Sequence, residues 1–201
     1  MEQSKPDYIG SEIADAEISA KVPEDYRRLL AETNGFILFN GGLHVRGAVF
    51  SPEWHSLRKV WFGDFALYRL FPALKETDIP FAQDCLADQF VLRDGIVHKL
   101  DAEAGEIDSL GIDLQTFLQR AQANPVEYLS LEPLMKFMRE GGRLQFGQLL
   151  SVYPPFITKE AANGISLKAI PMFDRIGFLA DFARQTANLS EDEIQQVVEC
   201  D

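Results

Sequence analysis

The acidic stretch from Ile79 to Leu110 constrains the fold most, because its turn residues divide it into consecutive short strands. Asp94-Gly95 stands between two candidate strands, Asp88–Arg93 and Ile96–Leu100, and Asp-Gly is a strong signal for a two-residue β-hairpin turn. A looser turn at Ala102–Gly105 leads into a further strand, Glu106–Leu110. The stretch therefore predicts antiparallel strands joined by tight turns.

A helix is predicted ahead of these strands. Apolar and small residues recur at helical spacing through Tyr26, Leu30 and Thr33, which gives one buried stripe. Pro23 suits the first helical position, and Gly35 suits the residue that ends the helix. A pair of short strands is predicted next. The first strand is Phe36–Phe39, the turn is Asn40-Gly41-Gly42, and the returning strand is Leu43–Arg46.

An aromatic connector, Ser51–Pro72, joins the two groups of strands. Phe65, Tyr68 and Phe71 recur every third residue, so we expect a helix from about Gly63. Exposed aromatic residues bind protein partners well, which makes Trp54 a candidate contact residue. The spacing of the other aromatic residues around it favours packing in the core as the alternative.

A helix over Asp113–Ala123, capped by the side chain of Asp113, closes the first part of the sequence. Pro125 then marks a boundary, and we predict a domain over residues 1–124 and a C-terminal extension over residues 125–201. The elements expected in the extension are a helix at Leu134–Arg139, strands at Leu149–Tyr153 and Ser166–Ile170, a helix at Ile176–Thr186 and a helix start with capping-box spacing at Ser190–Glu193. Its strands bury too little to fold alone, so we expect it to pack on the first part.

Length and cysteine content are those of a protein that needs neither disulfides nor metal to fold. A chain of 201 residues buries roughly 70% of the surface that its unfolded form exposes. Cys85 and Cys200 lie far apart and form no metal-ligand spacing, so we expect reduced thiols in a cytoplasmic protein. The N-terminal residues lack the pattern of a signal peptide, and no apolar run is long enough to span a membrane.

The charge of the chain restricts its partners. The formal net charge is −12, and the segment from Glu76 to Asp113 holds ten acidic against two basic residues, a balance of −8. Such a field repels phosphate backbones and anionic membranes and speeds encounters with cationic surfaces. We therefore expect no nucleic acid and no membrane as partners. The alternative is that aspartates in turns and a solvated sheet face account for the charge without any partner.

The sequence offers little catalytic chemistry. The three histidines form no metal-binding motif, and no catalytic residue, cofactor or metal ligand is predicted. Acidic neighbours are expected to raise the pKa of Cys85 rather than activate its thiol. One alternative is a small-molecule-binding or hydrolytic domain that uses His98 with Asp84 or Asp88. We interpret the two aspartates instead as loop caps, because nothing in the sequence separates their pKa values.

Six short motifs follow one another in the first part of the sequence, and they are Val22-Pro23-Glu24-Asp25-Tyr26, Leu29-Leu30, Asn34-Gly35, Ile79-Pro80-Phe81-Ala82, Asp88-Gln89-Phe90 and Gly95-Ile96-Val97-His98-Lys99-Leu100-Asp101. Their order resembles the SUKH superfamily, which includes bacterial immunity proteins and fungal cell-wall-assembly regulators. Two positions depart from the family pattern, since Ala87 stands where a glycine is usual and Val22 replaces the commoner leucine. The resemblance covers about Ile13 to Ala123.

The resemblance implies an α+β fold with a central, mostly antiparallel sheet backed by helices, extended here by an α/β segment. It also implies a non-enzymatic protein that binds another protein, such as an immunity protein that neutralises a bacterial toxin with a basic surface. A regulatory scaffold is the alternative within the same family. The residues we select as candidate partner contacts are Trp54, Asp84, Asp88, Asp94, Asp101, Glu103 and Glu106.

Overall fold

The computed structural model describes residues 5–187 and residue 189. The helix start predicted at Ser190–Glu193 and the second cysteine, Cys200, lie outside these residues.

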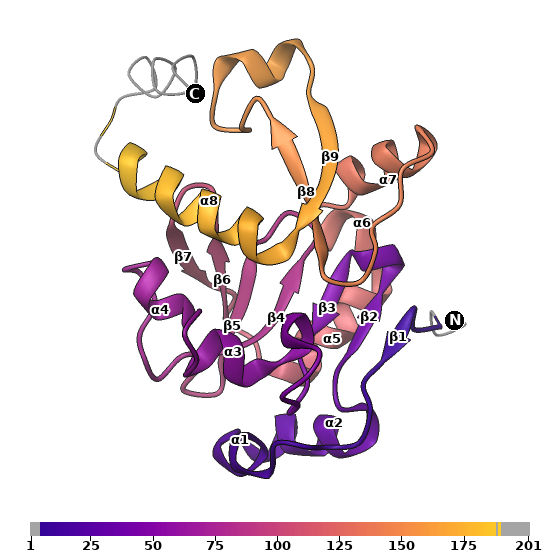
Figure 1. Cartoon of the computed structure of the whole chain (residues 1–201), viewed down its shortest axis with the longest axis vertical. Coiled ribbons are helices and arrows are strands. Elements are labelled where there is room, and N and C mark those ends of the chain that lie inside the picture. The colour runs from indigo at the N-terminus through magenta and orange to yellow at the C-terminus, as the bar shows by residue number, and fades with distance from the viewer. Residues whose placement is uncertain (1–4, 188, 190–201) are drawn as a thin grey trace.

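A seven-stranded antiparallel sheet forms the centre of the molecule, and its strands lie side by side in chain order (Figure 1). The strands are β1 (Tyr8–Ile9), β2 (Phe36–Leu38), β3 (Leu43–Val45), β4 (Ile79–Asp84), β5 (Gln89–Arg93), β6 (Ile96–Asp101) and β7 (Glu106–Ser109). This arrangement confirms the predicted α+β class with a central antiparallel sheet backed by helices.

The turn predicted between β5 and β6 has the expected chemistry. Asp94 and Gly95 both adopt positive φ angles, of 53° and 78°. Two successive left-handed residues are the requirement of a type I′ turn, which matches the twist of the strands that it joins. The acidic stretch therefore folds as the hairpin that its sequence predicts.

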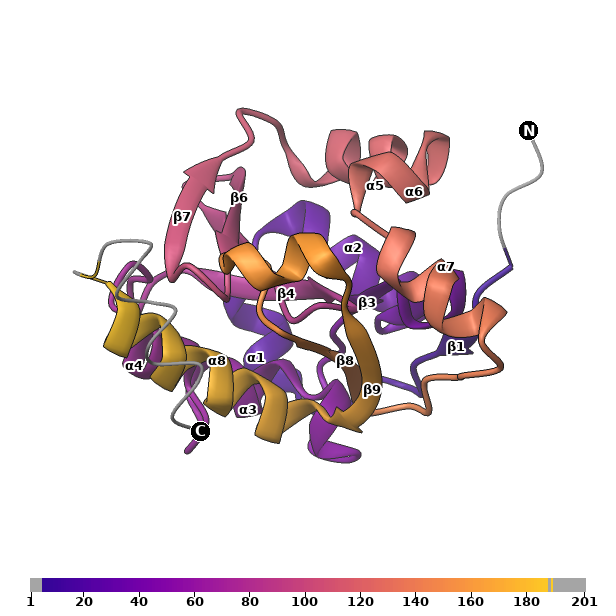
Figure 2. The same ribbon diagram turned by 90° about the horizontal axis from the view of Figure 1, so that it is seen from above.

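Helices cover both faces of the sheet (Figure 2). One face carries α2 (Glu24–Thr33) and α5 (Leu114–Ala123), and Phe117 of α5 packs on Phe81 of β4 and Phe90 of β5. The other face is covered by the helices α3 (Leu57–Trp61), α4 (Leu67–Leu70) and α8 (Met172–Thr186). The short helix α1 (Ala16–Lys21) precedes α2.

The caps of the two predicted helices are formed largely as expected. The Asp113 side chain accepts a hydrogen bond from the Thr116 amide and begins α5. In α2, Pro23 is the residue before the first helical position rather than the first helical residue itself. Asn34 ends α2 in the left-handed conformation, and Gly35 follows with a φ of 79°.

The helix predicted from about Gly63 is present only as the four-residue α4 (Leu67–Leu70), so its predicted start is wrong. Gly63 instead ends α3, where its amide donates to the Arg58 carbonyl, and the next helix, α4, begins only at Leu67. The Ser56 side chain accepts from the Lys59 amide and begins α3, directly after a 3₁₀ turn, η2, at Glu53–His55. The aromatic spacing misled the prediction because only Tyr68 lies in α4, whereas Phe65 precedes this helix and Phe71 follows it.

The C-terminal extension packs on the sheet. Its elements are α6 (Pro125–Tyr128), α7 (Glu132–Arg139), β8 (Gln148–Tyr153), the 3₁₀ turn η3 (Lys159–Asn163), β9 (Ser166–Pro171) and α8. The strands β8 and β9 form a separate antiparallel hairpin. The Leu150 amide donates to the Cys85 carbonyl at 2.8 Å, and Leu149, Leu150 and Ile176 belong to the same buried core as the sheet.

Candidate functional site

The acidic residues proposed from the sequence as partner contacts do not form one surface. Asp94, Asp101 and Glu106 are exposed, whereas Asp84 is 1% exposed and Glu103 is 7% exposed. A buried carboxylate does not meet a partner. The expectation that Asp84 and Glu103 lie on a charged face is therefore wrong.

Asp84 caps the loop between β4 and β5. Its Oδ1 accepts hydrogen bonds from the Leu86 amide at 2.8 Å and the Asp88 amide at 3.0 Å. Its Oδ2 is buried and has no hydrogen-bond partner. Burial, together with the nearby Asp88 carboxylate, raises the pKa of Asp84 well above its usual range. The structure thus confirms the loop-cap interpretation of Asp84.

Asp88 joins this loop to the next hairpin. Its Oδ1 accepts from the Ala102 amide at 3.0 Å, and its Oδ2 lies 2.8 Å from Nζ of Lys99. Burial raises the pKa of Asp88, and the Lys99 ammonium partly opposes that rise. Both carboxylate oxygens of Asp88 therefore interact with groups of the same chain.

Glu103 holds the C-terminal extension against the sheet. Its Oε1 accepts from the Ile157 amide at 2.8 Å, across 54 residues of sequence. Burial raises the pKa of Glu103, while the Ile157 hydrogen bond and the Arg175 guanidinium of α8 act in the opposite direction. Hence the residue contacts its own chain rather than a partner.

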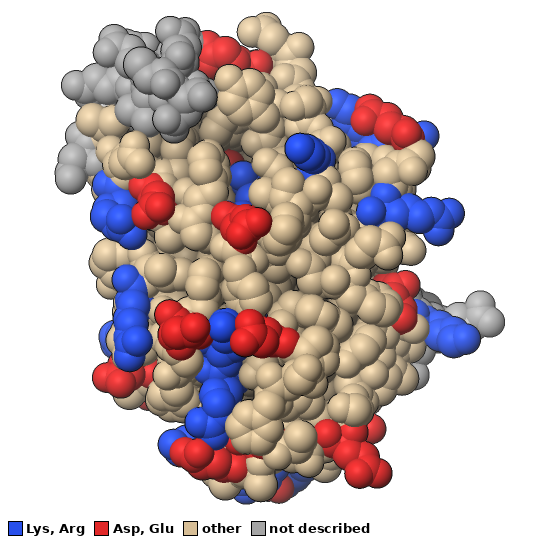
Figure 3. Space-filling view, viewed as in Figure 1, with Lys and Arg blue, Asp and Glu red and all other residues tan. Residues whose placement is uncertain are grey.

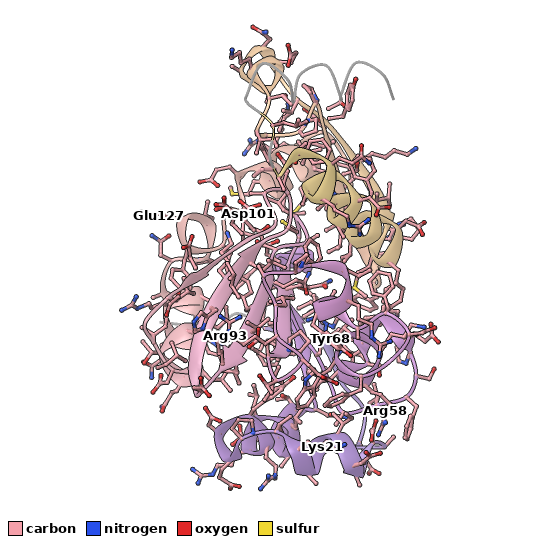
Figure 4. All side chains as sticks on the ribbon, turned by 90° about the vertical axis from the view of Figure 1, so that its left-hand side faces the viewer. Lys21, Arg58, Tyr68, Arg93, Asp101 and Glu127 are labelled. Atoms are coloured by element: carbon pink, nitrogen blue, oxygen red, sulfur yellow. The ribbon has the colours of Figure 1, made fainter. Side chains whose placement is uncertain are left out.

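The exposed carboxylates that remain near the end of β6 and on β7 are Asp101, Glu106 and Asp108, which we call the acidic edge. Asp101 caps the β6–β7 turn, because its Oδ1 accepts from the amides of Glu103 and Ala104, each at 2.9 Å. Figure 4 shows Asp101 at the end of the sheet nearer the extension, with Arg93 toward the opposite end. Among the described residues, no ion pair involves the acidic edge.

His98 does not combine with the aspartates. It stands beside Lys99 on β6, and successive residues of a strand point to opposite faces of the sheet. Since Lys99 reaches Asp88, His98 faces the other side, where its Nδ1 lies 3.2 Å from the Ile96 carbonyl. The His98 dyad with Asp84 or Asp88, considered as an alternative, is not formed.

A second polar region lies on the face of the sheet that the extension covers. Ile37, His44 and Gln83 stand directly opposite one another on β2, β3 and β4, so they share one face. A cavity of about 250 Å³ separates this row from the segment 143–149. The side chains and backbone that line it come from Asp7, Ile37, Asn40, Gly41, His44, Gln83, Met138, Arg143, Leu144, Gln145, Phe146, Gly147, Gln148, Leu149 and Met172.

Aromatic rings support one wall of this cavity. Trp54 is half-buried and packs on Tyr8, His44 and Phe146, with ring centroids 5.1, 5.4 and 5.9 Å away. Trp54 therefore packs against other aromatic rings of this chain, as the alternative interpretation of the sequence predicted. Phe146 is 53% exposed and lies at the cavity itself.

The two buried histidines form a directed chain behind the cavity. Nε2 of His55 lies 2.8 Å from the Asn34 carbonyl, which only accepts, so this nitrogen carries the proton. Nδ1 of the neutral His55 ring is then an acceptor, and Nε2 of His44, at 2.9 Å, must donate to it. This order leaves Nδ1 of His44 as an unprotonated acceptor.

Burial keeps both rings neutral. It lowers the pKa of His44 well below its usual value, and the neighbouring His55 adds to the effect. Burial likewise lowers the pKa of His55 to about 4, although the hydrogen bond to Asn34 opposes the change.

A cation without a carboxylate lies beside the histidines. Arg46 is 0% exposed, and its guanidinium donates to the carbonyls of Pro80 and Ala82 and to the side-chain oxygens of Gln83 and Gln89. Burial lowers the pKa of Arg46 to about 10, so it remains charged at neutral pH. Within the described part of the chain, only neutral carbonyl and amide dipoles stabilise the positive charge of Arg46. One of these groups, the side chain of Gln83, also lines the cavity.

Sequence reasoning missed this region. His44 and Arg46 alternate with Leu43 and Val45 in a short predicted strand, which places the two polar residues on one face. That alternation was the available signal, but it usually indicates a solvated face. Here the extension covers it.

Comparison with family models and with curated proteins finds no match for this sequence. Among solved structures, the crystal structure of Atu4351 from Agrobacterium tumefaciens is similar, with a TM-score of 0.54 and 10% sequence identity. The match covers 87% of this chain and 83% of that one. At this identity the similarity concerns the fold, and it includes most of the C-terminal extension.

Within residues 5–187 and residue 189, no group of three or more His, Cys, Asp or Glu side chains is placed to hold a metal ion. None of the helices in this part of the chain has the length and apolar character needed to cross a membrane.

Proposed function

We propose that this protein binds a basic protein partner through the acidic edge and the β7 strand that carries it. The observation that supports this proposal is an open strand with uncompensated charge. β7 is the last strand of the sheet, and Glu106 and Asp108 on it are exposed and unpaired among the described residues.

The backbone of β7 offers hydrogen bonds to a partner. The Leu110 amide donates inward to Val97 of β6, and amides alternate in direction along a strand. The amides of Ile107 and Ser109 therefore face away from the sheet. An extended segment of another protein can add to such an edge, with main-chain bonds giving affinity and side chains giving selectivity.

The negative charge of β7 favours a basic partner segment at this edge of the sheet. Glu106 and Asp108 lie on one face of β7 with Asp101 opposite Glu106 on β6. Lysine or arginine side chains at alternate positions of the partner would meet these carboxylates. Charges at such a rim raise the rate of association and make binding sensitive to salt.

The face of the molecule that carries α8 and β9 offers no comparable field. Figure 3 shows charged side chains of both signs scattered over that face, with wide uncharged areas between them. Figure 4, turned by 90° from that view, shows Asp101 of the acidic edge.

The finer proposal is an immunity protein, as the SUKH resemblance implies. Many toxins act on nucleic acids, and their clefts are basic because they bind phosphates. An acidic strand that occupies such a cleft would exclude the substrate. The regulatory-scaffold alternative uses the same surface but a constitutive partner.

The test begins with the proteins encoded beside this gene, each produced with and without this chain in a susceptible host. We expect one of them to inhibit growth and this chain to relieve the inhibition. A purified mixture should then show a complex that weakens steeply between 50 and 200 mM salt, about the range over which surface charges are progressively screened.

Two variants locate the interface. Glu106→Lys with Asp108→Lys reverses the edge, and we expect affinity to fall by about a hundredfold or more. Glu12→Lys with Glu32→Lys changes the net charge equally at exposed sites elsewhere and should have a small effect. Equal loss of affinity in both double variants would contradict a role for this edge.

Ser109→Pro separates the backbone contribution from charge. It removes an outward amide while leaving the inward bonds of β7 intact, and proline is tolerated on edge strands. Loss of binding in a variant with unchanged thermal stability supports strand addition. Unchanged binding would leave the charged side chains, not the strand, as the contact.

A further inference from the structure

The geometry points to a second binding site, in the cavity between the sheet and the segment 143–149, for a small aromatic carboxylate that carries a hydroxyl group. The hydroxyl donates to Nδ1 of His44, the ring lies among the apolar wall residues, and the carboxylate meets the Arg143 guanidinium. This site does not depend on the acidic edge or on the proposed partner.

The first argument is the unpaired acceptor of His44. This residue is 5% exposed and lines the cavity. Its Nε2 is committed to His55, and no described residue donates a hydrogen bond to its Nδ1. A site built around a buried acceptor rejects ligands that lack the matching donor, because the acceptor then stays unpaired.

The second argument is the rigidity of that acceptor. The chain from Asn34 through His55 fixes the tautomer of His44, and Trp54 packs against both rings. Gln83, the neighbour of His44 on β4, is fixed as well, since it accepts from Arg46 and its Nε2 lies 2.9 Å from Sδ of Met172. The floor of the cavity is therefore preorganised for one hydrogen-bond pattern.

The third argument is the character of the walls. Leu144, Phe146 and Met172 supply apolar surface, and Phe146 is also more than half exposed. The volume of about 250 Å³ is slightly below the roughly 300–1,000 Å³ of common ligand sites, so the ligand has about ten heavy atoms. One aromatic ring with two small substituents fits these limits.

The fourth argument is charge. Arg143 is exposed at the cavity, and the buried Arg46 adds a second positive charge behind Gln83 with no carboxylate beside it. Asp7 is the acidic residue of the lining, and its Oδ2 already accepts from the Asn40 amide at 2.7 Å. The lining therefore favours an anionic ligand over a cationic one.

The experiment uses the full chain and four probes built on one benzene ring, measured by calorimetry and by ligand-detected NMR. The probes are 4-hydroxyphenylacetate, phenylacetate without the hydroxyl, p-cresol without the carboxylate, and tyramine with an ammonium in its place. We expect 4-hydroxyphenylacetate to bind with a dissociation constant of about 1 mM or lower. The hydroxyl should contribute about tenfold, and tyramine should bind most weakly.

Variants assign the contacts. Arg143→Gln should weaken 4-hydroxyphenylacetate by about fivefold and leave p-cresol unchanged. Arg139→Gln, an exposed arginine on α7 outside the lining, is the matched control and should change neither. His44→Phe should remove the preference for the hydroxyl, and the comparison of probes on the unmodified chain still decides the question if that variant does not fold.

Three results would overturn the inference. The first is no saturable binding of any probe at 10 mM. The second is equal affinity for 4-hydroxyphenylacetate and phenylacetate, and the third is tighter binding of tyramine than of 4-hydroxyphenylacetate. The variant with Glu106→Lys and Asp108→Lys should bind the probes normally. That outcome distinguishes failure of this site from failure of the proposed interface.

Discussion

Two neighbouring residues of β4, Gln83 and Asp84, belong to buried polar regions of opposite charge. Gln83 lies on the face with His44 and helps to surround the Arg46 cation with neutral dipoles. Asp84 lies on the other face, where carboxylates share backbone amides and the single ammonium of Lys99. Four acceptor oxygens meet the two terminal nitrogens of Arg46, its buried Nε has no partner, and the cation stays charged at neutral pH, whereas burial raises the pKa of the Asp84 and Asp88 carboxyl groups.

The difference indicates how much the stability of the fold depends on the charge of Arg46 and on that of Asp84. The acceptors of Arg46 all come from β4, β5 and the residues between them, so the guanidinium links a continuous part of the sheet. Around Asp84 the hydrogen bonds use one oxygen, and the other has no partner. We therefore expect the chain to need the charge at Arg46 and to tolerate its loss at Asp84.

The largest effect should come from Arg46→Met. The substitution leaves two carbonyls and two amide oxygens unpaired in the core, and such losses typically cost about 3–5 kcal/mol of the free energy of unfolding. Urea denaturation measures the change. Arg28→Met, at an exposed arginine of α2, should cost less than about 0.5 kcal/mol. Similar small costs at both positions would show that the sheet does not depend on the buried cation.

The next effect concerns pH and the His55 ring. Its pKa is about 4 in the folded protein and near 6.5 when unfolded, so the unfolded chain binds the proton more readily. Its contribution to stability is complete above pH 6.5 and is lost as the pH falls from 6.5 toward 4, by about 3 kcal/mol in all.

Comparison with His55→Gln isolates this contribution, because the carboxyl groups titrate in both proteins. The difference in free energy of unfolding between the wild type and His55→Gln should shrink steadily between pH 6.5 and 4. A difference that stays constant over this range would mean that the His55 ring is not held neutral.

A smaller effect of opposite sign is expected at Asp84. Its pKa is raised on folding, so at neutral pH the charged carboxylate lowers stability, and this penalty disappears as the pH falls through the raised pKa. Asp84→Asn keeps an oxygen for the Leu86 and Asp88 amides. It should stabilise the protein at pH 8 by about 1 kcal/mol, and by progressively less in acid. Destabilisation at every pH would show that the carboxylate charge is needed there.

The smallest effect should follow Glu106→Gln, because the acidic edge makes no internal contact that stability requires. We expect the free energy of unfolding to change by less than about 0.5 kcal/mol, as measured in urea. The same single change should still lower affinity for a basic partner. A large loss of stability would place Glu106 with the internal carboxylates rather than with the edge.

Local signals in the sequence predicted the sheet and its turns well. Asp94-Gly95 and the cap at Asp113 act within a few residues, so their geometry follows from neighbouring chemistry. The aromatic connector failed because three-residue spacing was interpreted as one helix, while Gly63 ends a helix there. The packing of the short helices α3 and α4 determined the structure of this segment more than its helical spacing did.

The candidate sites were harder to predict because they depend on distant segments. Glu103 is buried by a loop 54 residues later, and its acidic neighbours gave no sign of that contact. The cavity needs His44 of β3 and Met172 of α8 together, and neither residue is unusual in its own segment. Alternation placed His44 and Arg46 on one face, but the aromatic connector, through Trp54 and His55, and the docked extension together turn that face into an interior.

The order of strands in the sheet has a consequence for how the chain is made. Each strand pairs with the one synthesised just before it, so the sheet can grow from β1 to β7 while the chain is emerging. The strand β8 and the helix α8 that cover its second face come last. A ribosome-bound chain would therefore hold an assembled sheet whose side toward Leu149 and Met172 stays exposed to solvent until residues 148–186 are synthesised, and a chaperone could bind it during that interval.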